Sequence, residues 1–456
     1  MRQLCFLEIF CLAIAWMSLT LGINPAFGLK GEILKQEHSL DSNQASDKKG
    51  SRVITLTLNQ ALELALSKSP ELAAARFEIF ALEGGAIQAG LFPNPELGLE
   101  LEHFGGSGDF EGVNAAERTG RVSQLIELAG KRSKRKHVAS LEATLARLDY
   151  ETKRLDVVAR VHKNFIEALS AQKRMGLVKE LTRLAQQVLT TASERVKAGK
   201  ASPLEETKAK VALSKTLIDL RRAQRELTTM RKRLASNWGA VSPDFKRVEG
   251  DLESIERLPA HKKLRHLVLR NPDLTRSGIE VERRHALLNS ETSKRWPDLT
   301  LGGGVRYYDQ TDDHAFLAGL SIPLPFFSRN QGAILEAQQR ISKAKEERRI
   351  TYLSILTSLA QAYQELSTAS AEVTILKKDV LPGAHQAFEA AREGYKQGKL
   401  NYLDVLDAQR TLFEARTQYF DVLANYHKTM AEVERLTGAS HSDIKDLEKK
   451  ELEDES

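Results

Sequence analysis

Cysteine is nearly absent from this chain of 456 residues: its two cysteines, Cys5 and Cys11, both lie close to the N-terminus. We interpret residues 1–28 as an export signal, because basic Arg2 precedes an apolar run and small residues end the segment. The run is shorter than the roughly 20 residues that a membrane-spanning helix needs, although a membrane anchor stays an alternative. A mature chain without this segment would carry no thiol, which excludes disulfides and thiolate metal sites.

The sequence also lacks the motifs of enzymes and metal sites. Its 11 histidines are scattered, and neither HExxH, GxSxG nor a phosphate-binding loop occurs. One loop places His314 beside Asp309, Asp312 and Asp313, a group that could attract a cation, but we interpret it as a solvated hairpin tip. The sequence therefore predicts no enzyme activity, no cofactor and no bound metal.

An excess of charge of one sign is missing as well. The net charge of +6 is small for this length, because acidic residues nearly balance the basic ones. The run KRSKRK at Lys131–Lys136 could suggest a nuclear address or a phosphate-binding patch. In an exported chain, a solvated helix start or a membrane-surface anchor is the better interpretation, and we predict no nucleic-acid partner.

Proline is scarce over two long intervals. None occurs between Leu128 and Pro203, or between Pro325 and Pro382. About 65 residues of the first interval can therefore form one helix, which at 1.5 Å per residue approaches 100 Å. A globular core is not that long, so the pattern predicts a rod or the wall of a tube.

The chain does contain an internal repeat. The segment YKQGKLNYLDVLDAQ at Tyr395–Gln409 has the layout of VKAGKASPLEETKAK at Val196–Lys210, with Gly398 and Gly199 at matching positions. This layout predicts two helical hairpins that reverse at these glycines. Large apolar residues recur every seven positions along both returning helices, as in antiparallel coiled coils: Leu213, Leu220, Leu227 and Leu234, then Leu412, Tyr419, Tyr426 and Val433.

Four segments alternate between apolar and polar residues, which is the period of a β-strand: 96–104, 119–128, 298–308 and 315–324. In the first, Leu99 and its neighbours face one way while Glu100 and Glu102 face the other. A wall that is apolar on one face and charged on the other fits a lipid-facing, water-lined barrel, with an ordinary soluble α+β protein as the alternative. Four strands cannot close a barrel alone, so a membrane location would require several copies.

These patterns divide the chain into five segments. We expect two structural repeats, with helix reversals at Gly199 and Gly398, between a disordered leader and a charged tail. The boundaries are a signal peptide at 1–28, the leader at 29–52, repeat one at 53–245, repeat two at 246–440 and the tail at 441–456.

Several motifs carry a resemblance to a known family over nearly the whole mature length. They are FPNPEL, GKR at Gly130–Arg132, PLPFFSRNQG at Pro323–Gly332, VLPGA at Val380–Ala384, and YKQGKLNYLDVLDAQRTL. With the duplication, the chain resembles TolC-like outer-membrane efflux proteins, and within them the cation-efflux, CzcC-like branch.

The resemblance implies a mainly α fold with a β-barrel part. Three copies would each contribute four strands to a shared barrel of twelve, and their coiled-coil hairpins would form a periplasmic α-barrel. The implied location is the outer membrane of a Gram-negative bacterium. The implied function is a passive exit duct that receives substrate, with heavy-metal cations as a candidate, from an inner-membrane RND-type pump through a periplasmic adaptor.

The resemblance also implies a periplasmic aperture at the helix tips, held shut by a tyrosine and carboxylates. The arginine that the family places two residues after Gly398 is Leu400 here, so any closure must use a different latch. By position, the aperture residues are Tyr395, Asp404, Asp407 and Glu205, and the adaptor-contacting tips are Gly199, Lys200, Gly398 and Lys399. The alternative for Asp404 and Asp407 is that they only stabilise a helix start.

Two other functions stay open at this point. The outlet of a protein-secretion system would also be a passive duct, and its sequence would be hard to distinguish. An exported coiled-coil structural protein without a pore would be water-soluble and would have no strands in a membrane.

Overall fold

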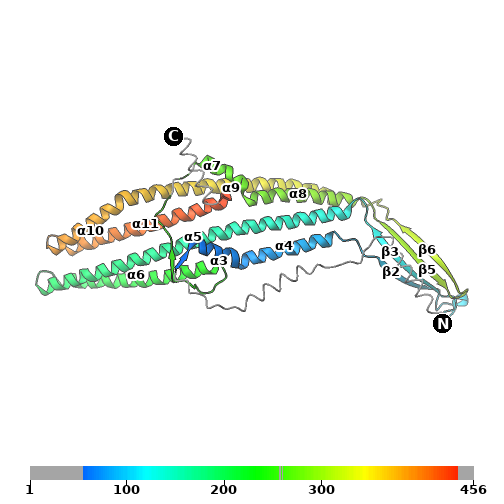
Figure 1. Ribbon diagram of the computed structural model, residues 1–456, viewed down its shortest axis with the longest axis horizontal. Coiled ribbons are helices and arrows are strands. Elements are labelled where there is room, and N and C mark those ends of the chain that lie inside the picture. The colour runs from blue at the N-terminus through cyan, green and yellow to red at the C-terminus, as the bar shows by residue number, and fades with distance from the viewer. Residues whose placement is uncertain (1–54, 256–257, 259, 440–456) are drawn as a thin grey trace. The chain divides into compact units, whose positions relative to one another are not determined.

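The computed structural model describes residues 55–255, 258 and 260–439, which belong to one compact unit (Figure 1). The predicted signal peptide, leader and charged tail lie outside these residues. Within these residues the chain is mostly helical, with one four-stranded sheet and one two-stranded sheet. The fold class predicted from the sequence, mainly α with a smaller β part, is confirmed.

The first repeat is built on one very long helix. Helix α5 (Lys131–Lys197) runs unbroken for 67 residues, and α6 (Pro203–Ser236) returns beside it. No proline or β-strand pattern interrupts α5, and Pro203 starts α6 at the first helical position, where its missing N–H costs nothing. The remaining helices of this repeat are α3 (Leu58–Lys68) and α4 (Pro70–Ala89).

The second repeat follows the same plan with one interruption. Its long helix leaves α-geometry for one turn, just before Pro382, where the VLPGA motif stands. Proline lacks the N–H that would bond the preceding turn, which accounts for a local change of helix type. The helical segments are α7 (His261–Leu267), η2 (Val268–Arg270), α8 (Pro272–Ser293), α9 (Gln331–Ile375), the π-helical turn η3 (Leu376–Val380), α10 (Leu381–Lys396) and α11 (Tyr402–Thr437).

The four long strands form one antiparallel sheet in the order β2-β3-β5-β6. The central pair joins the repeats, because β3 belongs to the first and β5 to the second. Figure 1 shows this sheet at one end of the long helices and both helix reversals at the other. The bounds are β2 (Glu96–Glu102), β3 (Glu117–Ile126), β5 (Leu299–Tyr308) and β6 (Asp313–Ser321), with a short 3-10 turn η1 (Gly108–Phe110) between β2 and β3.

A second, smaller sheet lies where the repeats meet. Strand β1 (Thr55–Thr57) pairs in parallel with β4 (Arg247–Glu249), which belongs to the connection between the halves. The side chain of Gln172 on α5 extends the ladder: it donates to the carbonyl of Val248 at 3.0 Å and accepts from its N–H at 3.2 Å. The segment that connects the two repeats is therefore attached to α5 through the side-chain amide of Gln172.

The seven-residue column of the second repeat is fully buried, whereas in the first repeat Leu227 and Leu234 are buried and Leu213 and Leu220 are half-buried. In α11, Leu412, Tyr419, Tyr426 and Val433 are all buried. Helix α11 packs on α5, α9 and α10. None of the described helices is long and apolar enough to cross a membrane.

Candidate functional site

The two helix reversals have the same backbone construction. Gly199 and Gly398 adopt φ values of +68° and +75°, which only glycine enters without strain. After each glycine the chain closes the helix by a bond to the carbonyl five residues back: Lys200 to Arg195 at 2.8 Å and Lys399 to Gly394 at 2.8 Å. This Schellman arrangement satisfies carbonyls at the helix end. The two segments that share a layout in the sequence therefore also share a hydrogen-bond pattern.

The side chains at the two tips meet on Tyr395. Its ring is 3% exposed, and its hydroxyl donates to Glu205 Oε2 at 3.2 Å. The guanidinium of Arg195 lies 4.5 Å from the centre of the ring and also donates to the Tyr395 carbonyl. Because Arg195 and Glu205 flank the first reversal and Tyr395 precedes the second, this cluster ties the two hairpins of one chain together.

Burial sets the protonation state of this cluster. Burial, followed by the charge of Glu205, raises the pKa of Tyr395 to about 12, against the opposing effect of the Arg195 cation. Burial, followed by the Glu205 charge, also raises the pKa of Tyr402, whose ring lies 6.2 Å from that of Tyr395. Both phenols therefore stay neutral near pH 7, and Tyr395 remains a hydrogen-bond donor to Glu205.

Two of the predicted aperture residues are brought together, and two are not. Tyr395 and Glu205 share a hydrogen bond, whereas Asp404 and Asp407 are exposed on the surface of α11. Asp404 accepts from the N–H of Asn401 at 2.9 Å, which forms a capping box at the start of α11. Asp404 therefore does stabilise the start of α11, as the alternative interpretation expected. Both aspartate side chains remain exposed in the single chain.

Leu400 occupies the place of the missing arginine without forming any ionic contact. It packs over Gly394, where an added Cβ would lie only 2.7 Å from Leu400 Cδ1. The cation that contacts Tyr395 is instead Arg195, on the other hairpin. Sequence reasoning missed Arg195, and no local pattern marks it, because its partners lie about 200 residues away. The Asn401–Asp404 capping box did have a signal, in the N-x-x-D spacing.

The predicted adaptor-contacting residues lie at the ends of the hairpins. Gly199, Lys200, Gly398 and Lys399 are all exposed. Lys396 is also exposed, and it pairs with Glu393 at 3.8 Å on its own helix. The tips therefore present lysine side chains to their surroundings.

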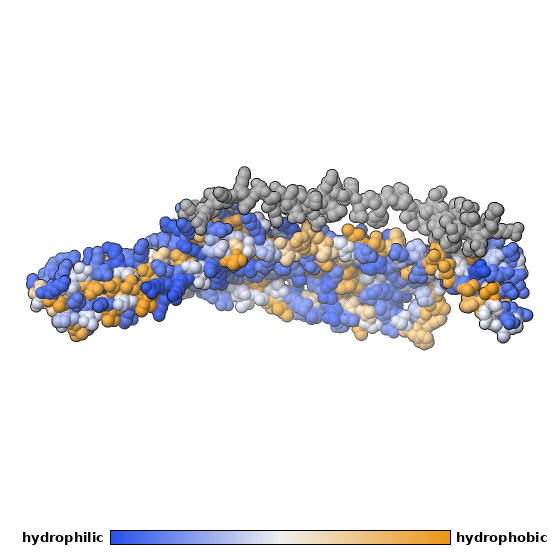
Figure 2. Space-filling view, turned by 90° about the horizontal axis from the view of Figure 1, so that it is seen from below, coloured by the Kyte–Doolittle hydropathy of each residue, from blue (hydrophilic) through white to orange (hydrophobic). Residues whose placement is uncertain are grey.

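At the opposite end, the strand register separates two chemically different faces. On one face Leu97, Leu99 and Phe316 are 58%, 77% and 79% exposed. On the other, Arg306 crosses three strands: it bonds Glu102 at 2.8 Å, Glu117 at 2.6 Å and Thr119 at 2.9 Å. Figure 2 shows hydrophobic residues exposed at the sheet and among hydrophilic ones along the helices.

The acidic loop beside His314 does not assemble a metal site. Asp309 pairs with Arg118 at 2.8 Å, and Asp312 accepts from the hydroxyl of Tyr307. Across the residues that the structure describes, no group of three or more His, Cys, Asp or Glu side chains could hold a metal ion. The interpretation as a hairpin tip agrees with these contacts.

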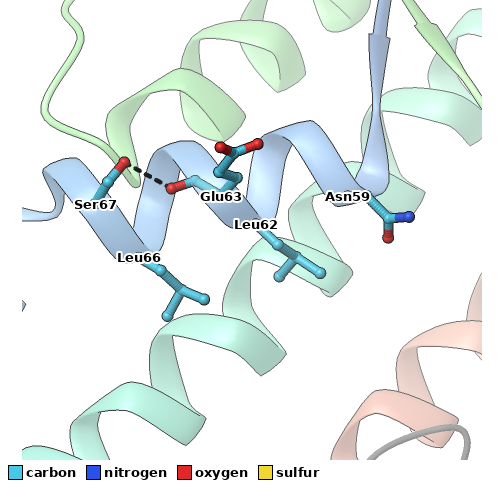
Figure 3. A pocket seen from close by; sticks show the side chains of 5 residues that line it. All are labelled: Asn59, Leu62, Glu63, Leu66 and Ser67. Atoms are coloured by element: carbon cyan, nitrogen blue, oxygen red, sulfur yellow. Dashed lines mark hydrogen bonds between the residues drawn. The ribbon is translucent and has the colours of Figure 1, made fainter.

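A shallow groove on α3 is separate from both the tips and the sheet. It is lined by residues of that helix alone: Asn59, Leu62, Glu63, Leu66 and Ser67. Figure 3 shows Leu62 and Leu66 pointing away from the side that carries Glu63 and Ser67, and the Ser67 hydroxyl donates to the Glu63 carbonyl at 2.7 Å. With no converging ionisable groups, the groove has no features of a catalytic site.

A two-faced sheet joined to long helical hairpins defines a class: membrane channel proteins with a wall of strands in the membrane and of helices beyond it. The chain belongs to the outer membrane efflux protein family, whose model matches residues 61–240 and 264–439. The two matches follow the two repeats. The protein is thus an efflux channel of the outer membrane, and the predicted resemblance is confirmed.

Individual comparisons agree with the family assignment. The chain is 38% identical to the cobalt-zinc-cadmium resistance protein CzcC of Cupriavidus metallidurans, over 84% of this chain and 90% of that protein. It is 26% identical to the nickel-cobalt-cadmium resistance protein NccC of Alcaligenes xylosoxydans xylosoxydans, over 62% and 64%. The structure of the outer-membrane channel OprN matches with a TM-score of 0.72 at 18% identity, over 84% and 90% of the chains.

Membership decides between the functions that the sequence left open. The family consists of channel proteins rather than enzymes, and neither the protein-secretion outlet nor the structural protein without a pore is favoured.

Proposed function

We propose that the protein is the passive exit duct of a tripartite efflux system for divalent metal cations. Three copies would form one channel, which receives its substrate from an inner-membrane RND-type pump through a periplasmic adaptor. The observation that carries the proposal is the sheet register, which sets exposed leucines on one face and ion-paired side chains on the other.

The need for several copies follows from the edges of the sheet. Strands β2 and β6 each have one neighbour within the described residues. In lipid, an unpaired backbone edge costs several kcal/mol per polar group, so the edges must be paired by another chain. Three copies give twelve strands, between the eight that side chains just fill and the sixteen or more that leave a wide aqueous channel. Such a barrel suits small solutes.

The proposed cargo rests on two supports. The names of CzcC and NccC describe resistance to divalent metals. At the tips, exposed Asp404 and Asp407 would bring two carboxylates per copy towards a shared axis. A ring of carboxylates favours cations over anions. Glu205 and Tyr395 would hold the hairpins beneath this ring in a fixed relation.

The proposed adaptor contacts lie on the same tips. Gly199, Lys200, Gly398 and Lys399 are exposed at the two reversals, so two lysines per copy could meet an acidic surface. Substituting both lysines by glutamine should weaken adaptor binding without changing channel conductance, since both side chains are exposed whereas Tyr395 is buried.

Conductance of the purified protein in planar bilayers tests the duct. The native protein should conduct, prefer cations, and lose part of that preference when Asp404→Asn and Asp407→Asn are combined. The matched control combines Glu63→Gln and Asp244→Asn, two exposed carboxylates away from the tips, and should leave the reversal potential unchanged. Absence of any conductance from trimeric protein would refute the duct, and an unchanged preference in the tip variant would refute the carboxylate ring.

A further inference from the structure

The start of α5 carries a run of basic residues at the end of a helix that favours anions. Five of the first six residues of α5, Lys131–Lys136, are basic, and its first turn holds no acidic side chain. The positive end of the helix dipole opposes such a run, so these charges destabilise the helix unless an anion lies close by. Gly130, at the N-cap position, has no side chain that could accept a hydrogen bond from the first turn. The run therefore requires an explanation other than helix formation.

Acidic residues of the same chain neutralise two of these five charges. Lys131 pairs with Asp298 at 2.7 Å, and Arg135 pairs with Glu127 at 2.5 Å. One acid directly precedes β5 and the other directly follows β3, so these pairs attach the start of α5 to the four-stranded sheet. The other three basic side chains have no carboxylate partner among the described residues: Arg132, Lys134 and Lys136.

Arg132 and Lys136 share one face of α5 with an exposed aromatic ring. The two residues are four apart, so they are neighbours on the helix surface. The guanidinium carbon of Arg132 lies 3.7 Å from the centre of the Phe92 ring. A Cβ added at Gly90, where α4 ends, would lie 3.1 Å from Lys136 Cδ. Phe92 is nonetheless 69% exposed and Lys136 is exposed as well, so two cations and one ring open onto one surface.

Lys134 belongs to the same run but not to this surface. It is half-buried and precedes Val138 by about one helical turn, and Val138 is buried in a cluster with Ala286 of α8. Two residues separate Lys134 from Arg132, which turns it about 200° around the helix. Lys134 therefore provides an internal comparison of equal charge on a different face.

The surface around Phe92 continues onto the apolar face of the sheet. Phe92 lies in the connection between α4 and β2, and Leu97 and Leu99 of β2 are 58% and 77% exposed. In an outer-membrane channel, an exposed apolar face of strands lies against lipid hydrocarbon. Figure 1 shows α4 and α5 reaching the sheet in this region. Arg132 and Lys136 therefore stand where the hydrocarbon ends and the lipid headgroups begin.

The two ends of the sheet differ in charge. At the far end the loops hold Asp109, Glu111, Asp312 and Asp313, whereas the basic run lies at the end that adjoins the helices. Acidic loops repel a phosphate group, and cations attract it. A lipid phosphate is therefore attracted to the helical side of the membrane, which faces the periplasm.

We propose that Arg132 and Lys136 bind the phosphate of an anionic phospholipid in the periplasmic leaflet, while an acyl chain of that lipid packs on Phe92. The planar guanidinium of Arg132 can donate to two phosphate oxygens, and the Lys136 ammonium adds a second charge on a flexible stem. A zwitterionic headgroup carries a cation of its own, which these two cations repel. The site lies within one chain, so it goes beyond the proposed function and depends on neither the number of copies nor the cargo.

Lipid binding by the full-length protein in detergent, measured by native mass spectrometry, tests this site. The probes are phosphatidylglycerol, which is anionic, and phosphatidylcholine, which is zwitterionic. The native protein should bind phosphatidylglycerol more tightly than phosphatidylcholine. Combining Arg132→Gln with Lys136→Gln should weaken phosphatidylglycerol binding about 25-fold and remove the preference, because each basic side chain near an anionic lipid surface contributes about a factor of five.

Two controls of equal charge separate the site from general electrostatic attraction. Lys215→Gln with Arg221→Gln removes two exposed cations from α6 and should leave phosphatidylglycerol binding unchanged. Lys136→Gln alone should weaken the binding about fivefold, and Lys134→Gln should weaken it less. Because the Lys136 side chain is exposed, this variant should keep the native helix content by circular dichroism.

Phe92→Ala tests the contact with the hydrocarbon chain. It should weaken the binding of phosphatidylglycerol, because the exposed ring is lost, and should leave the binding of inorganic phosphate unchanged. Phe110→Ala, in the loop at the far end of the sheet, should change neither. An unchanged affinity of Phe92→Ala for phosphatidylglycerol would overturn the acyl-chain contact.

Equal weakening in the α5 and α6 double variants, or in Lys134→Gln and Lys136→Gln, would overturn the proposed site. Equal binding of the two lipids by the native protein would overturn it too, as would displacement of the lipid by inorganic phosphate at equal concentration, which indicates a site for a soluble anion. Conductance in bilayers of phosphatidylcholine tests the duct without this lipid. A conducting channel without preference for phosphatidylglycerol contradicts the lipid site alone and leaves the proposed function intact.

Discussion

The hydrogen bond between Tyr395 and Glu205 makes the aperture hypothesis quantitative. Tyr395→Phe removes the hydroxyl and keeps the ring under Arg195, so only the donor to Glu205 Oε2 at 3.2 Å is lost. A hydrogen bond to a charged group contributes about 1.5–3 kcal/mol, and the partial exposure of Glu205 points to the lower end. If the bond exists only in the closed tip, its loss should raise the open probability about tenfold per copy, since 1.4 kcal/mol is a factor of ten.

Single-channel recording measures this directly, because open probability and unitary conductance are separate readouts. The matched control is Tyr419→Phe: Tyr419 is 5% exposed, and its hydroxyl has no partner within the described part of the chain. That variant should leave gating unchanged. An open probability that rises less than about twofold in Tyr395→Phe, against the tenfold expected for a lost bond, would refute the latch and leave Tyr395 as a packing residue.

Four further outcomes follow from the same structure. Gly199→Ala and Gly398→Ala should each lower stability by about 1 kcal/mol because of the positive φ, whereas Gly176→Ala, within α5, should raise it by roughly 0.5–1 kcal/mol; thermal unfolding of each variant distinguishes the signs. Arg195→Lys should raise the open probability in bilayer recordings, since an ammonium cannot both lie flat over the Tyr395 ring and bond its carbonyl. Arg306→Met should lower the temperature at which the assembly dissociates in detergent, because about 1–3 kcal/mol is lost when Glu117 keeps its charge without this partner. The folded chain holds Tyr395 protonated up to about pH 12, whereas the unfolded chain releases this proton near pH 10. The free energy of unfolding should therefore be unaffected by this group below pH 10 and fall by about 1.4 kcal/mol per pH unit between the two values. Comparing the alkaline unfolding of the native protein with that of Tyr395→Phe measures this fall.

Local patterns in the sequence predicted much of this architecture because each has a local cause. A glycine followed by a helix start marks a reversal through the backbone conformations that only glycine reaches, and alternation marks strands through the two faces of a pleat. The predicted strands at 119–128 and 315–324 lie slightly later than β3 and β6, since alternation continues past the last paired residues.

What the sequence did not predict depends on distant contacts. The pairing of β3 with β5, which merges two hairpins into one sheet, is not encoded by either strand alone. Likewise, Arg195 is one of many arginines in α5, and only the folded chain places it over Tyr395. The change of helix type at Leu376–Val380 was not predicted either, since the absence of proline before Pro382 indicated only an unbroken helix up to that point.

The contacts at the tips of each copy bear on how such a duct would open. Within one chain, Tyr395 and its two partners tie the first hairpin to the second, so the tips resist separation from each other. Between copies, the tips would bring together the exposed side chains of Asp404 and Asp407, which repel across an axis unless cations screen them. If the duct opens with the Tyr395 contacts intact, the two hairpins of each copy move outward together. If it opens by breaking these contacts, the two hairpins of one copy separate from each other. A tenfold effect of Tyr395→Phe selects the second route, and its absence, together with an effect of neutralising the aspartates, selects the first.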